Sequence, residues 1–431
     1  MDEKFEAIVV GAGPAGTSAA IVLARAGVKV LLLERGDYPG SKNVMGGVLY
    51  RQATEEIIPE FWKEAPLERR VVEQRLWVVS GEAAVTLGYK SDRFSREPYN
   101  AFTVLRAKFD RWFARQAEKA GALLVTETVA DDLLVEGERV VGVRTDRPDG
   151  DLRADVVILA EGVNSLLTWK AGLRGDISPN HLAVAVKEII ALPAEKIQDR
   201  FNLEDGEGAT IELVGEVTRG MVGTAFIYTN HDSLSVGVGV LISDLIEKIM
   251  TPNDLLEGVK NHPLVRPLLA GGETKEYLGH MIPEGGYRHI PRLFRDGLLV
   301  VGDAAMLVNG IQRQGSNMAM TSGRLAAETV LEAREKGDFS ARTLSIYREK
   351  LKNSYVLQDL YRYRNASRYF EGHRELFDLY PHLLTEAAYQ MTTVDGTPKQ
   401  EKRKRVIQHI RRQRPLWRIA RDLAAGWRVL G

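Results

Sequence analysis

The stretch EAIVVGAGPAGTSAAIVLARAGVKVLLLER, residues 6–35, decides the fold. Its short apolar run Ala7–Val10 predicts a buried parallel strand, and the apolar run Val28–Leu33 predicts a second one. Between the two lies the glycine pattern G-x-G-x-x-G, followed by a helical segment. The order strand, glycine turn, helix, strand is typical of a dinucleotide-binding unit, whereas the glycine pattern alone is weak evidence.

Each glycine of this turn has its own task in such a unit. Gly11 permits the sharp turn, Gly13 lets the backbone approach a pyrophosphate, and Gly16 lets the helix pack against the strand. The positive end of a helix that begins with Pro14 and Ala15 also favours a diphosphate. We therefore predict a bound dinucleotide; the alternative is a structural turn without a ligand.

The residue that ends the second strand bears on which dinucleotide is bound. Glu34 lies 18 residues after Gly16, where a carboxylate can accept hydrogen bonds from a ribose 2′-hydroxyl. A carboxylate there argues against a 2′-phosphate, so FAD or NAD fits better than NADP. The neighbouring Arg35 is the one feature that keeps NADP open.

A second strand end of this kind lies in GLLVVGDAAMLVNGIQRQGSNMAMTSGRLAAETV, residues 297–330. An apolar strand ends at Gly302, and Asp303 is then placed to bind a ribityl or ribose hydroxyl, unless it merely caps the turn. A long helix follows from about Gly315, and its amino end can stabilise an anionic reduced flavin ring.

Two further segments are candidates for cofactor contact. The loop GDYPGSKNVMGGVLY, residues 36–50, contains Gly46 and Gly47, so its backbone can approach something large and flat; an ordinary surface loop is the alternative. Arg106 precedes an amphipathic helix and could pair with a phosphate or serve as a solvated cap. A buried strand before Gly162 ends in small residues, which fits another contact with the dinucleotide.

The rest of the chain predicts a second domain and a helical end. Residues 182–241 contain four strand-like segments separated by Gly, Asn and Asp turns, which predict an antiparallel sheet. Residues 52–68 and those after 340 have helical patterns. We expect an α/β (α+β overall) chain with three regions. They are an FAD-binding domain (1–75, 100–180 and 275–340), a substrate domain (76–99 and 181–274) and a helical C-terminal region (341–431).

Composition narrows the chemistry. The chain of 431 residues has no cysteine, which excludes disulfides, thiolate-ligated iron–sulfur clusters, a cysteinyl flavin and a redox dithiol. Its eight histidines show no metal-ligand spacing, and we predict no metal. No apolar run reaches 18 residues, so no spanning helix is expected, and the N-terminus runs straight into the first strand without a signal-peptide pattern.

The charge of the chain is unevenly distributed. Residues 398–431 contain eleven Lys or Arg and two Asp or Glu, a charge of +9, and the neutral whole leaves −9 on the rest. In the last helix the apolar residues Leu416, Ile419, Leu423, Trp427 and Leu430 share one face, and Arg414, Arg418, Arg421 and Arg428 lie on another. This pattern suits a helix on an anionic membrane, and equally one docked on the protein's own body or on an acidic partner. Nucleic acid fits less well, because the body is acidic.

Beyond these motifs the sequence resembles the electron-transfer-flavoprotein–quinone oxidoreductases, in particular their FixC branch, over residues 6–370. This branch belongs to the geranylgeranyl-reductase-like flavoproteins. The segments that carry the resemblance are GAGPAG (11–16), LLERGDYPGSKNVMGGVLY (32–50), NHPLVRPLLAGGE (261–273), GHMIPEGGYRHIPRLFRDGLLVVGDAA (279–305) and YVLQDLYRYR (355–364). The resemblance implies a glutathione-reductase-type, Rossmann-like FAD fold with an inserted antiparallel-sheet domain.

The resemblance also implies a function. FAD would accept electrons from an electron-transfer flavoprotein and pass them to a membrane quinone, such as menaquinone or ubiquinone. Gly285 and Gly286 of the IPEGG turn would meet the quinone, and nearby His289 and Tyr287 could relay protons, although we favour a structural role for both. The expected FAD-binding residues are Gly11, Gly13, Pro14, Ala15, Gly16, Glu34, Arg35, Gly46, Gly47, Arg106, Val129, Gly162, Gly302, Asp303, Gly315 and Asn317.

Partners follow from a departure from the family. Longer members carry a cysteine-rich [4Fe–4S] domain, which this cysteine-free chain lacks, and in the FixC branch the cluster lies on a separate ferredoxin-like subunit. We therefore expect that subunit and the alpha and beta subunits of an electron-transfer flavoprotein as partners, in a complex of the kind that bifurcates electrons from NADH. We expect a cytoplasmic protein, peripheral on the inner face of the cell membrane.

Three other functions stay open. An FAD-dependent geranylgeranyl or prenyl-lipid reductase would have the same fold and a lipid alkene as substrate. A flavin hydroxylase would oxidise NAD(P)H rapidly as an isolated chain. An FAD-bearing structural subunit would never turn its flavin over. The specific PGSKN–GG and IPEGG segments favour the quinone function over these.

Overall fold

The computed structural model describes residues 4–42 and 45–430, which form two compact units. The first, which we name the parallel-sheet unit, comprises residues 1–68, 99–182 and 280–364. The second, the mixed-sheet unit, comprises residues 69–98, 183–279 and 365–431. The helical C-terminal region is divided between the units, with residues 341–364 in the first and residues 365–431 in the second. The domain boundaries expected from the sequence stay a prediction.

A parallel sheet forms the centre of the first unit, in the strand order β16-β17-β10-β1-β2-β7. All neighbours run parallel except β16 and β17. The strands are β1 (Phe5–Val10), β2 (Val30–Leu33), β7 (Leu123–Val125), β10 (Asp151–Leu159), β16 (Phe294–Arg295) and β17 (Leu298–Val300). The hairpin β8 (Ala130–Glu136) and β9 (Arg139–Thr145) pairs with β10, and β3 (Val48–Tyr50) pairs with β6 (Ala101–Thr103). The apolar runs read as buried strands are indeed buried.

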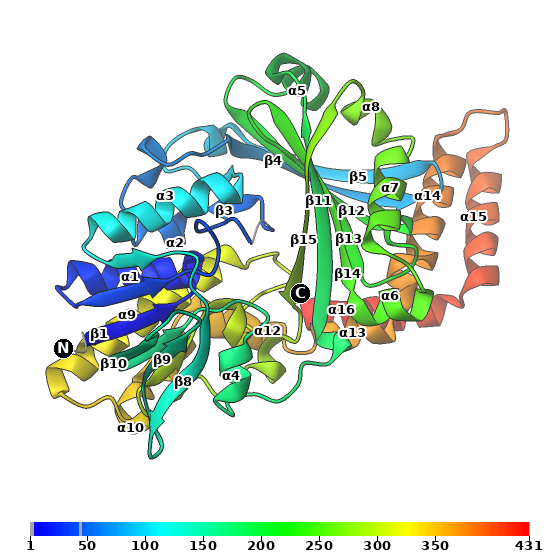
Figure 1. Cartoon of the computed structure of the whole chain (residues 1–431). Coiled ribbons are helices and arrows are strands. Elements are labelled where there is room, and N and C mark those ends of the chain that lie inside the picture. The colour runs from blue at the N-terminus through cyan, green and yellow to red at the C-terminus, as the bar shows by residue number, and fades with distance from the viewer. Residues whose placement is uncertain (1–3, 43–44, 431) are drawn as a thin grey trace. The chain divides into compact units, whose positions relative to one another are not determined.

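Two helices lie side by side along this sheet, α1 (Pro14–Arg25) and α9 (Ser316–Lys336) (Figure 1). They approach so closely that a Cβ on Gly323 would lie 2.0 Å from the backbone oxygen of Ala15. Only glycine fits there. The second glycine-rich segment therefore reaches the first through a contact between the two helices.

The other helices of the unit are shorter, apart from α3 (Arg106–Lys119), whose apolar stripe buries Phe109 and Phe113. They are α2 (Arg51–Glu55), α4 (Leu166–Lys170), α10 (Ala341–Leu344), α11 (Ile346–Asn353) and α12 (Tyr355–Arg362). The helix expected over residues 52–68 is wrong: α2 ends at Glu55, and only a 3₁₀ turn follows at Phe61–Lys63. Pro59 explains the break, because a proline removes a helix hydrogen bond and clashes with the preceding turn.

The second unit is built on a sheet in which β15-β11-β14-β13-β12-β4 are neighbours. The pairs among β11 to β14 are antiparallel, as expected, but β12 runs parallel to β4. The strands are β4 (Arg69–Ser80), β5 (Ala83–Lys90), β11 (Leu182–Ala191), β12 (Glu207–Gly215), β13 (Gly223–Thr229), β14 (Ser233–Leu241) and β15 (Glu273–Pro283). The helices between these strands are α5 (Ala194–Phe201), α6 (Ile242–Lys248), α7 (Pro252–Asn261) and α8 (Arg266–Leu269). Apolar residues of the sheet, α5 and α7 share one core.

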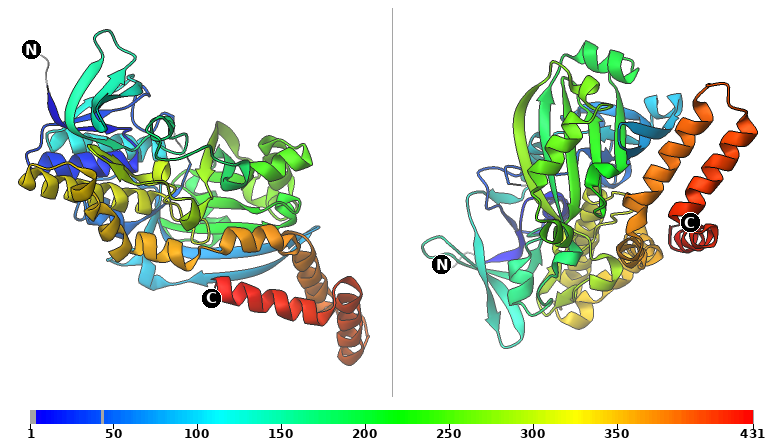
Figure 2. Two further views of the ribbon diagram at one scale, coloured as in Figure 1. Left: turned by 90° about the horizontal axis from the view of Figure 1, so that it is seen from below. Right: turned by 90° about the vertical axis from the view of Figure 1, so that its right-hand side faces the viewer.

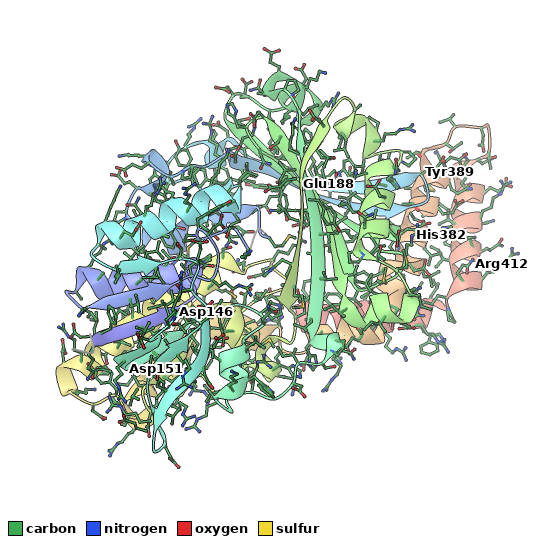
Figure 3. The ribbon with its side chains drawn as sticks, in the orientation of Figure 1. Asp146, Asp151, Glu188, His382, Tyr389 and Arg412 are labelled. Atoms are coloured by element: carbon green, nitrogen blue, oxygen red, sulfur yellow. The ribbon has the colours of Figure 1, made fainter. Side chains whose placement is uncertain are left out.

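Four helices end the chain: α13 (Ala366–Gly372), α14 (Leu379–Thr392), α15 (Lys399–Gln413) and α16 (Leu416–Leu430). Figure 2 shows α14 and α15 as a hairpin from which α16 turns away. Arg412 on α15 points outward (Figure 3). The basic residues of the tail thus begin on an exposed helix.

Helix α16 is anchored by its polar side. The buried Asp422 accepts hydrogen bonds from the Tyr380 hydroxyl (2.6 Å) and from Nε of Arg414 (3.0 Å). Its backbone oxygen accepts another from the Tyr369 hydroxyl at 2.9 Å, and that ring packs so close to Gly426 that a Cβ there would lie 2.7 Å from the hydroxyl. Because these contacts use the polar side, the apolar side is free to face solvent.

Part of the apolar face of α16 is in fact exposed, whereas Ile419 and Leu430 of that face are half-buried. Trp427 is 78% exposed and Leu423 is 65% exposed, and Trp417 and Leu416 are exposed too. The guanidinium groups of Arg418 and Arg421 lie over the Trp417 ring, at 5.3 Å and 5.5 Å from its centroid. The helix therefore presents aromatic and aliphatic side chains together with arginines.

We predict that Gly323→Ala lowers the free energy of unfolding of the FAD-free protein by about 1–3 kcal/mol, because the added methyl overpacks the contact between α1 and α9. Denaturant titration measures this. Gly258→Ala in α7 is the control, since nothing lies within 4 Å of its Cβ position. It should raise stability by about 0.5–1 kcal/mol through helix propensity. Equal effects of the two variants would contradict the account of the packing.

Candidate functional site

The glycine turn after β1 has two glycines that packing requires and one that it does not. Gly11 has a φ of +103°, and a Cβ on it would lie 2.4 Å from the backbone oxygen of Ala160. A Cβ on Gly16 would lie 1.9 Å from the backbone oxygen of Gly11. Around the Cβ position of Gly13, by contrast, no atom of residues 4–42 and 45–430 lies within 4 Å. The middle glycine thus leaves open space of the kind that a pyrophosphate needs.

The start of α1 is free of capping by side chains. Gly13 is the N-cap, Pro14 is the first helical residue, and the first turn holds no acidic residue. Glu34 supports the turn from behind, since its carboxylate accepts hydrogen bonds from the N–H of Ala12 (3.1 Å) and the N–H of Gly36 (2.8 Å). The helix end combines a positive dipole with uncapped N–H groups, which is an anion-binding arrangement.

The second glycine-rich segment comes to the same place. Gly302, at the end of β17, has a φ of +61°, and a Cβ on it would lie 2.9 Å from Cβ of Ala15 in the first turn of α1. Its N–H donates to Oγ of Ser322 in α9 at 3.0 Å. Burial raises the pKa of the neighbouring Asp303 to about 6, against the opposing effect of Arg106. Two motifs almost 300 residues apart therefore form one site at the carboxyl ends of the parallel strands, where such sheets bind ligands.

Arg106 holds three segments of the site together. It pairs with Asp110 through Nε and Nη2, both at 2.7 Å, and its Nη1 donates to the backbone oxygen of Met45 (2.9 Å) and to Oγ of Ser316 (3.1 Å). The guanidinium is buried. Most of its donors thus serve the protein itself, and its pairing with a phosphate stays a prediction.

His280 is a site residue that the sequence did not indicate. Its Nε2 is buried and has no hydrogen-bond partner within residues 4–42 and 45–430. Burial, with smaller effects of Arg106 and Arg35, lowers the pKa of the ring to about 4, so the ring is neutral at pH 7. A buried, unpaired nitrogen beside two arginines fits a site that an anionic, hydrogen-bonding cofactor completes. The donors and the open space at Gly13 together fit FAD.

The other expected FAD residues divide into those near the turn and those farther out. Gly46 has a φ of +90°, and a Cβ on it would lie 3.3 Å from Nη1 of Arg106; Asn43 and Val44 of the same loop lie outside the described residues. The backbone oxygen of Gly47 accepts from the N–H of Val104 at 2.9 Å. Gly162 has a φ of +75° and open space around its Cβ position.

At the far end, Gly315 is the uncapped N-cap of α9, and Nδ2 of Asn317 donates to Oε1 of Gln314 at 3.1 Å. Arg35 is exposed at the end of β2. Val129 is exposed as well, and its N–H donates to Oδ1 of Asp146 at 3.0 Å. These contacts assign no ligand to Val129, and its role stays a prediction.

The IPEGG turn has its own geometric reasons for glycine. A Cβ on Gly285 would lie 2.7 Å from Cβ of His289, while Gly286 has a φ of +60° and open space around it. The Nδ1–H of His289 donates to the backbone oxygen of Gly285 at 2.7 Å. The Tyr287 ring packs edge-on against Tyr361, with centroids 5.2 Å apart. The turn thus exposes backbone at Gly286 and fixes His289 beside it.

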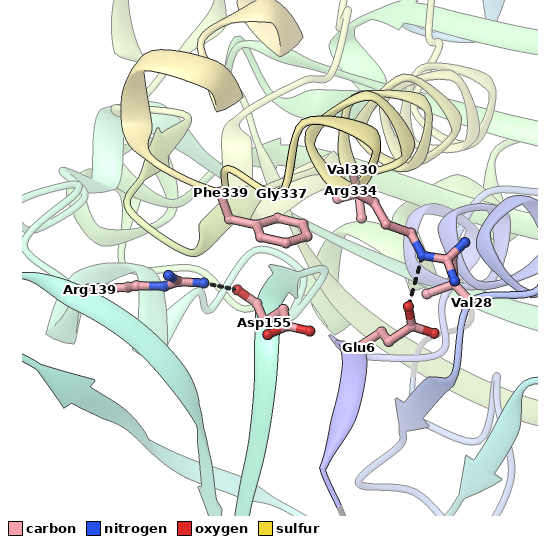
Figure 4. Close-up of a pocket in the computed structure, with 8 residues that line it drawn as sticks. All are labelled: Glu6, Val28, Arg139, Asp155, Val330, Arg334, Gly337 and Phe339. Atoms are coloured by element: carbon pink, nitrogen blue, oxygen red, sulfur yellow. Dashed lines mark hydrogen bonds and ion pairs between the residues drawn. The ribbon is translucent and has the colours of Figure 1, made fainter.

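A separate cavity of about 360 Å³ lies at the other end of the parallel sheet, near the start of β1 (Figure 4). It is lined by the start of β1 and the end of α9, where Glu6 and Nε of Arg334 pair at 2.8 Å. Because α/β sheets bind ligands at the carboxyl ends of their strands, this cavity is not the candidate cofactor site. Within the described residues, no cluster of three metal-ligating side chains is present, and no helix is long and apolar enough to cross a membrane.

Two family models match the chain. Residues 6–173 match the model of FAD-dependent oxidoreductases. Residues 366–431 match the model of the ETF-QO/FixC family C-terminal domain. The resemblance noted from the sequence ended at residue 370. The basic helical tail beyond it therefore matches the family's C-terminal domain as well.

Curated relatives are similar over the full length. Protein FixC of Bradyrhizobium diazoefficiens is 50% identical over 407 residues, which are 94% of each chain. Protein FixC of Azotobacter vinelandii is 47% identical over 431 residues and all of both chains. A probable electron transfer flavoprotein-quinone oxidoreductase of Escherichia coli is 42% identical and covers 95% of this chain and 96% of its own.

Solved structures agree on the fold. A geranylgeranyl bacteriochlorophyll reductase-like protein of Thermoplasma acidophilum superposes with a TM-score of 0.73 at 24% identity, covering 96% of this chain and 98% of its own. The flavin-dependent brominase Bmp2 gives a TM-score of 0.67 at 17% identity, covering 95% of this chain and all of its own. These likenesses show the expected flavoprotein fold, and at such identities they do not choose a reaction.

We predict that Gly13→Ala folds with unchanged stability but binds FAD about 10- to 100-fold more weakly. The methyl enters space that no protein atom uses, and it obstructs one or two hydrogen bonds to a charged pyrophosphate, each worth about 1.5–3 kcal/mol. Denaturant titration of the apoprotein and fluorescence titration with FAD measure the two quantities. Unchanged FAD affinity would contradict the assignment.

Proposed function

The chain belongs to the ETF-QO/FixC family of FAD-dependent oxidoreductases, and we propose that it accepts electrons from an electron-transfer flavoprotein and reduces a membrane quinone. The observation that carries this proposal is full-length similarity to a probable electron transfer flavoprotein-quinone oxidoreductase. The matching C-terminal model supports it. So does the FAD-compatible site, since residues 6–173 match the model of FAD-dependent oxidoreductases.

The chain's own residues supply position and electrostatics. Backbone N–H groups at the start of α1 would hold the pyrophosphate, and the Asp303 carboxylate would accept hydrogen bonds from ribityl hydroxyls. FAD, when bound, supplies the two-electron chemistry. The amino end of α9 has an uncapped positive dipole and no acid in its first turn, and it would favour negative charge on a flavin ring bound there.

In this proposal the quinone meets the flavin at the IPEGG turn. Gly286 offers backbone without a side chain and with open space around it. Gly285 is held beneath the ring of His289. A quinone oxygen is a hydrogen-bond acceptor, and exposed backbone N–H groups are donors that bind it without steric hindrance.

The proposed partners follow from the family and from the composition. The electrons come from the alpha and beta subunits of an electron-transfer flavoprotein. A separate ferredoxin-like subunit carries the [4Fe–4S] cluster that a chain without cysteine cannot ligate. We propose that this assembly takes electrons from NADH and bifurcates them, with the bifurcating flavin in a partner.

We further propose that α16 lies on the inner face of the cell membrane. Its polar side is used by the Asp422 anchor, and its exposed side presents Trp417, Leu423 and Trp427 with arginines beside them. Amphipathic helices with tryptophan and arginine lie at the interface of anionic membranes. A helix merely docked on the body would be expected to bury this apolar side instead.

We predict that the dithionite-reduced holoprotein is reoxidised rapidly by a short-chain quinone under anaerobic conditions, as followed by the return of the oxidised flavin spectrum. Reduced electron-transfer flavoprotein should reduce the flavin on the same timescale. A flavin that stays reduced with quinone, but saturates a prenyl lipid, would favour the lipid reductase instead. Rapid NADPH oxidation by the isolated chain would favour a hydroxylase.

We predict that Leu423→Ser with Trp427→Ser lowers binding to anionic liposomes by about tenfold or more, because about 1.4 kcal/mol of lost apolar burial already gives that factor. Leu87→Ser, at a 73% exposed residue of β5, is the control and should leave binding unchanged. Flotation in a density gradient measures the bound fraction. Unchanged liposome binding with loss of partner binding would assign the helix to a subunit interface.

A further inference from the structure

We propose that Glu284 is the residue that gives a proton to the quinone during its reduction, and that the imidazoles of His289 and His181 beside it resupply that proton from solvent. This inference rests on the proposed quinone function. Glu284 is the glutamate of the IPEGG segment, to which the family resemblance gave no role. It would make Glu284 a catalytic residue in a site that otherwise works through backbone.

The position of Glu284 is fixed from two sides. Its N–H donates to the backbone oxygen of His181 at 2.8 Å. Its carboxylate lies over Gly310, where an added Cβ would be 2.2 Å from Oε2 and 3.1 Å from Oε1. Gly310 belongs to the loop that joins Asp303 to the start of α9. The carboxyl therefore lies where the proposed quinone turn meets the loop of the FAD site.

A route to solvent lies in the same turn. The His289 ring lies against the His181 ring, with centroids 3.6 Å apart and the ring planes tilted by 37°. A carbonyl oxygen can only accept, so the bond from Nδ1 of His289 to Gly285 leaves Nε2 as the nitrogen that takes up and releases a proton. His289 is exposed, while Glu284 is half-buried. His181, whose backbone holds Glu284, thus joins its ring to an exposed imidazole, and this pair is the proposed route to solvent.

The electrostatic setting suits a proton donor. Burial raises the pKa of Glu284 to about 7, and no charged neighbour contributes to this shift. The titratable groups on the elements around it are His181, His289, Tyr287 and, beyond Gly310, Arg313, whose own pKa burial lowers to about 10. At neutral pH about half of the carboxyl groups keep their proton, which is the condition for an efficient general acid.

The balance of the step requires such a donor. Reduction of a quinone to a quinol takes up two electrons and two protons. FAD, when bound and reduced, would supply two electrons and one of these protons, so one further proton must come from elsewhere. In the proposed step the O–H bond of Glu284 breaks and an O–H bond forms on the quinone oxygen, and the resulting carboxylate then regains a proton from solvent.

The variant Glu284→Gln keeps the size of the side chain and removes its proton. We expect it to bind FAD normally and to be reoxidised normally by ferricyanide, which accepts electrons without protons. Reoxidation by a short-chain quinone should be slower by about 100-fold, the usual worth of a general acid. In the native protein this rate should fall as the pH rises through about 7, and that pH dependence should vanish in the variant.

A second readout does not depend on turnover. Infrared difference spectra of the oxidised holoprotein, native minus Glu284→Gln, should contain the band of a protonated carboxyl that disappears as the pH rises through about 7. Glu276→Gln, at an exposed carboxylate of β15, is the matched control and should change neither readout. Glu284→Asp, which keeps a proton donor, should restore part of the quinone rate and guards against a misfolded glutamine variant.

Two results separate the inference from its premise. If Glu284→Gln reduces quinone at the native rate with the native pH dependence, or if the carboxyl band does not titrate, the role of Glu284 is wrong while the quinone function stands. If the native holoprotein reduces no quinone, the proposed function itself fails.

Discussion

The close approach of backbone to backbone at the start of α1 is the constraint on which the parallel-sheet unit depends. The helix can leave β1 only because Gly16 has no side chain to meet the Gly11 oxygen, and α9 can lie beside it only because Gly323 leaves room for Ala15. The same contacts bring Gly302 to the first turn of α1. A cofactor site then forms from backbone, with Gly13 left open as the place for the pyrophosphate.

The parts of this site that are coded locally could be predicted from the sequence. The spacing of Gly11, Gly13 and Gly16 between two apolar strands needs no knowledge of distant residues, and neither does the strand end at Asp303. The helix expected after Gln52 failed for an equally local reason, because Pro59 outweighs the apolar periodicity around it. The quinone turn and the partners came from the family resemblance and not from spacing.

Other features could not be predicted, because their meaning depends on residues far away in the sequence. His280 stands alone in its strand, and only folding gives it a buried nitrogen near Arg106 that no described residue pairs with. Glu284 is an ordinary acidic residue until Gly310 packs under its carboxylate. The tail shows the same limit: its amphipathic pattern was plain, but the buried Asp422 decided which side of α16 docks and which side faces outward.

The flavin content of the purified protein tests the central claim most directly. The account predicts one FAD per chain, released by acid precipitation, and a link through cysteine is excluded because the chain has none. It also predicts that the apoprotein takes up FAD again in a ratio of one to one. A native protein that contains no flavin and takes up none, or one that holds FMN or NAD in this place, would contradict the account.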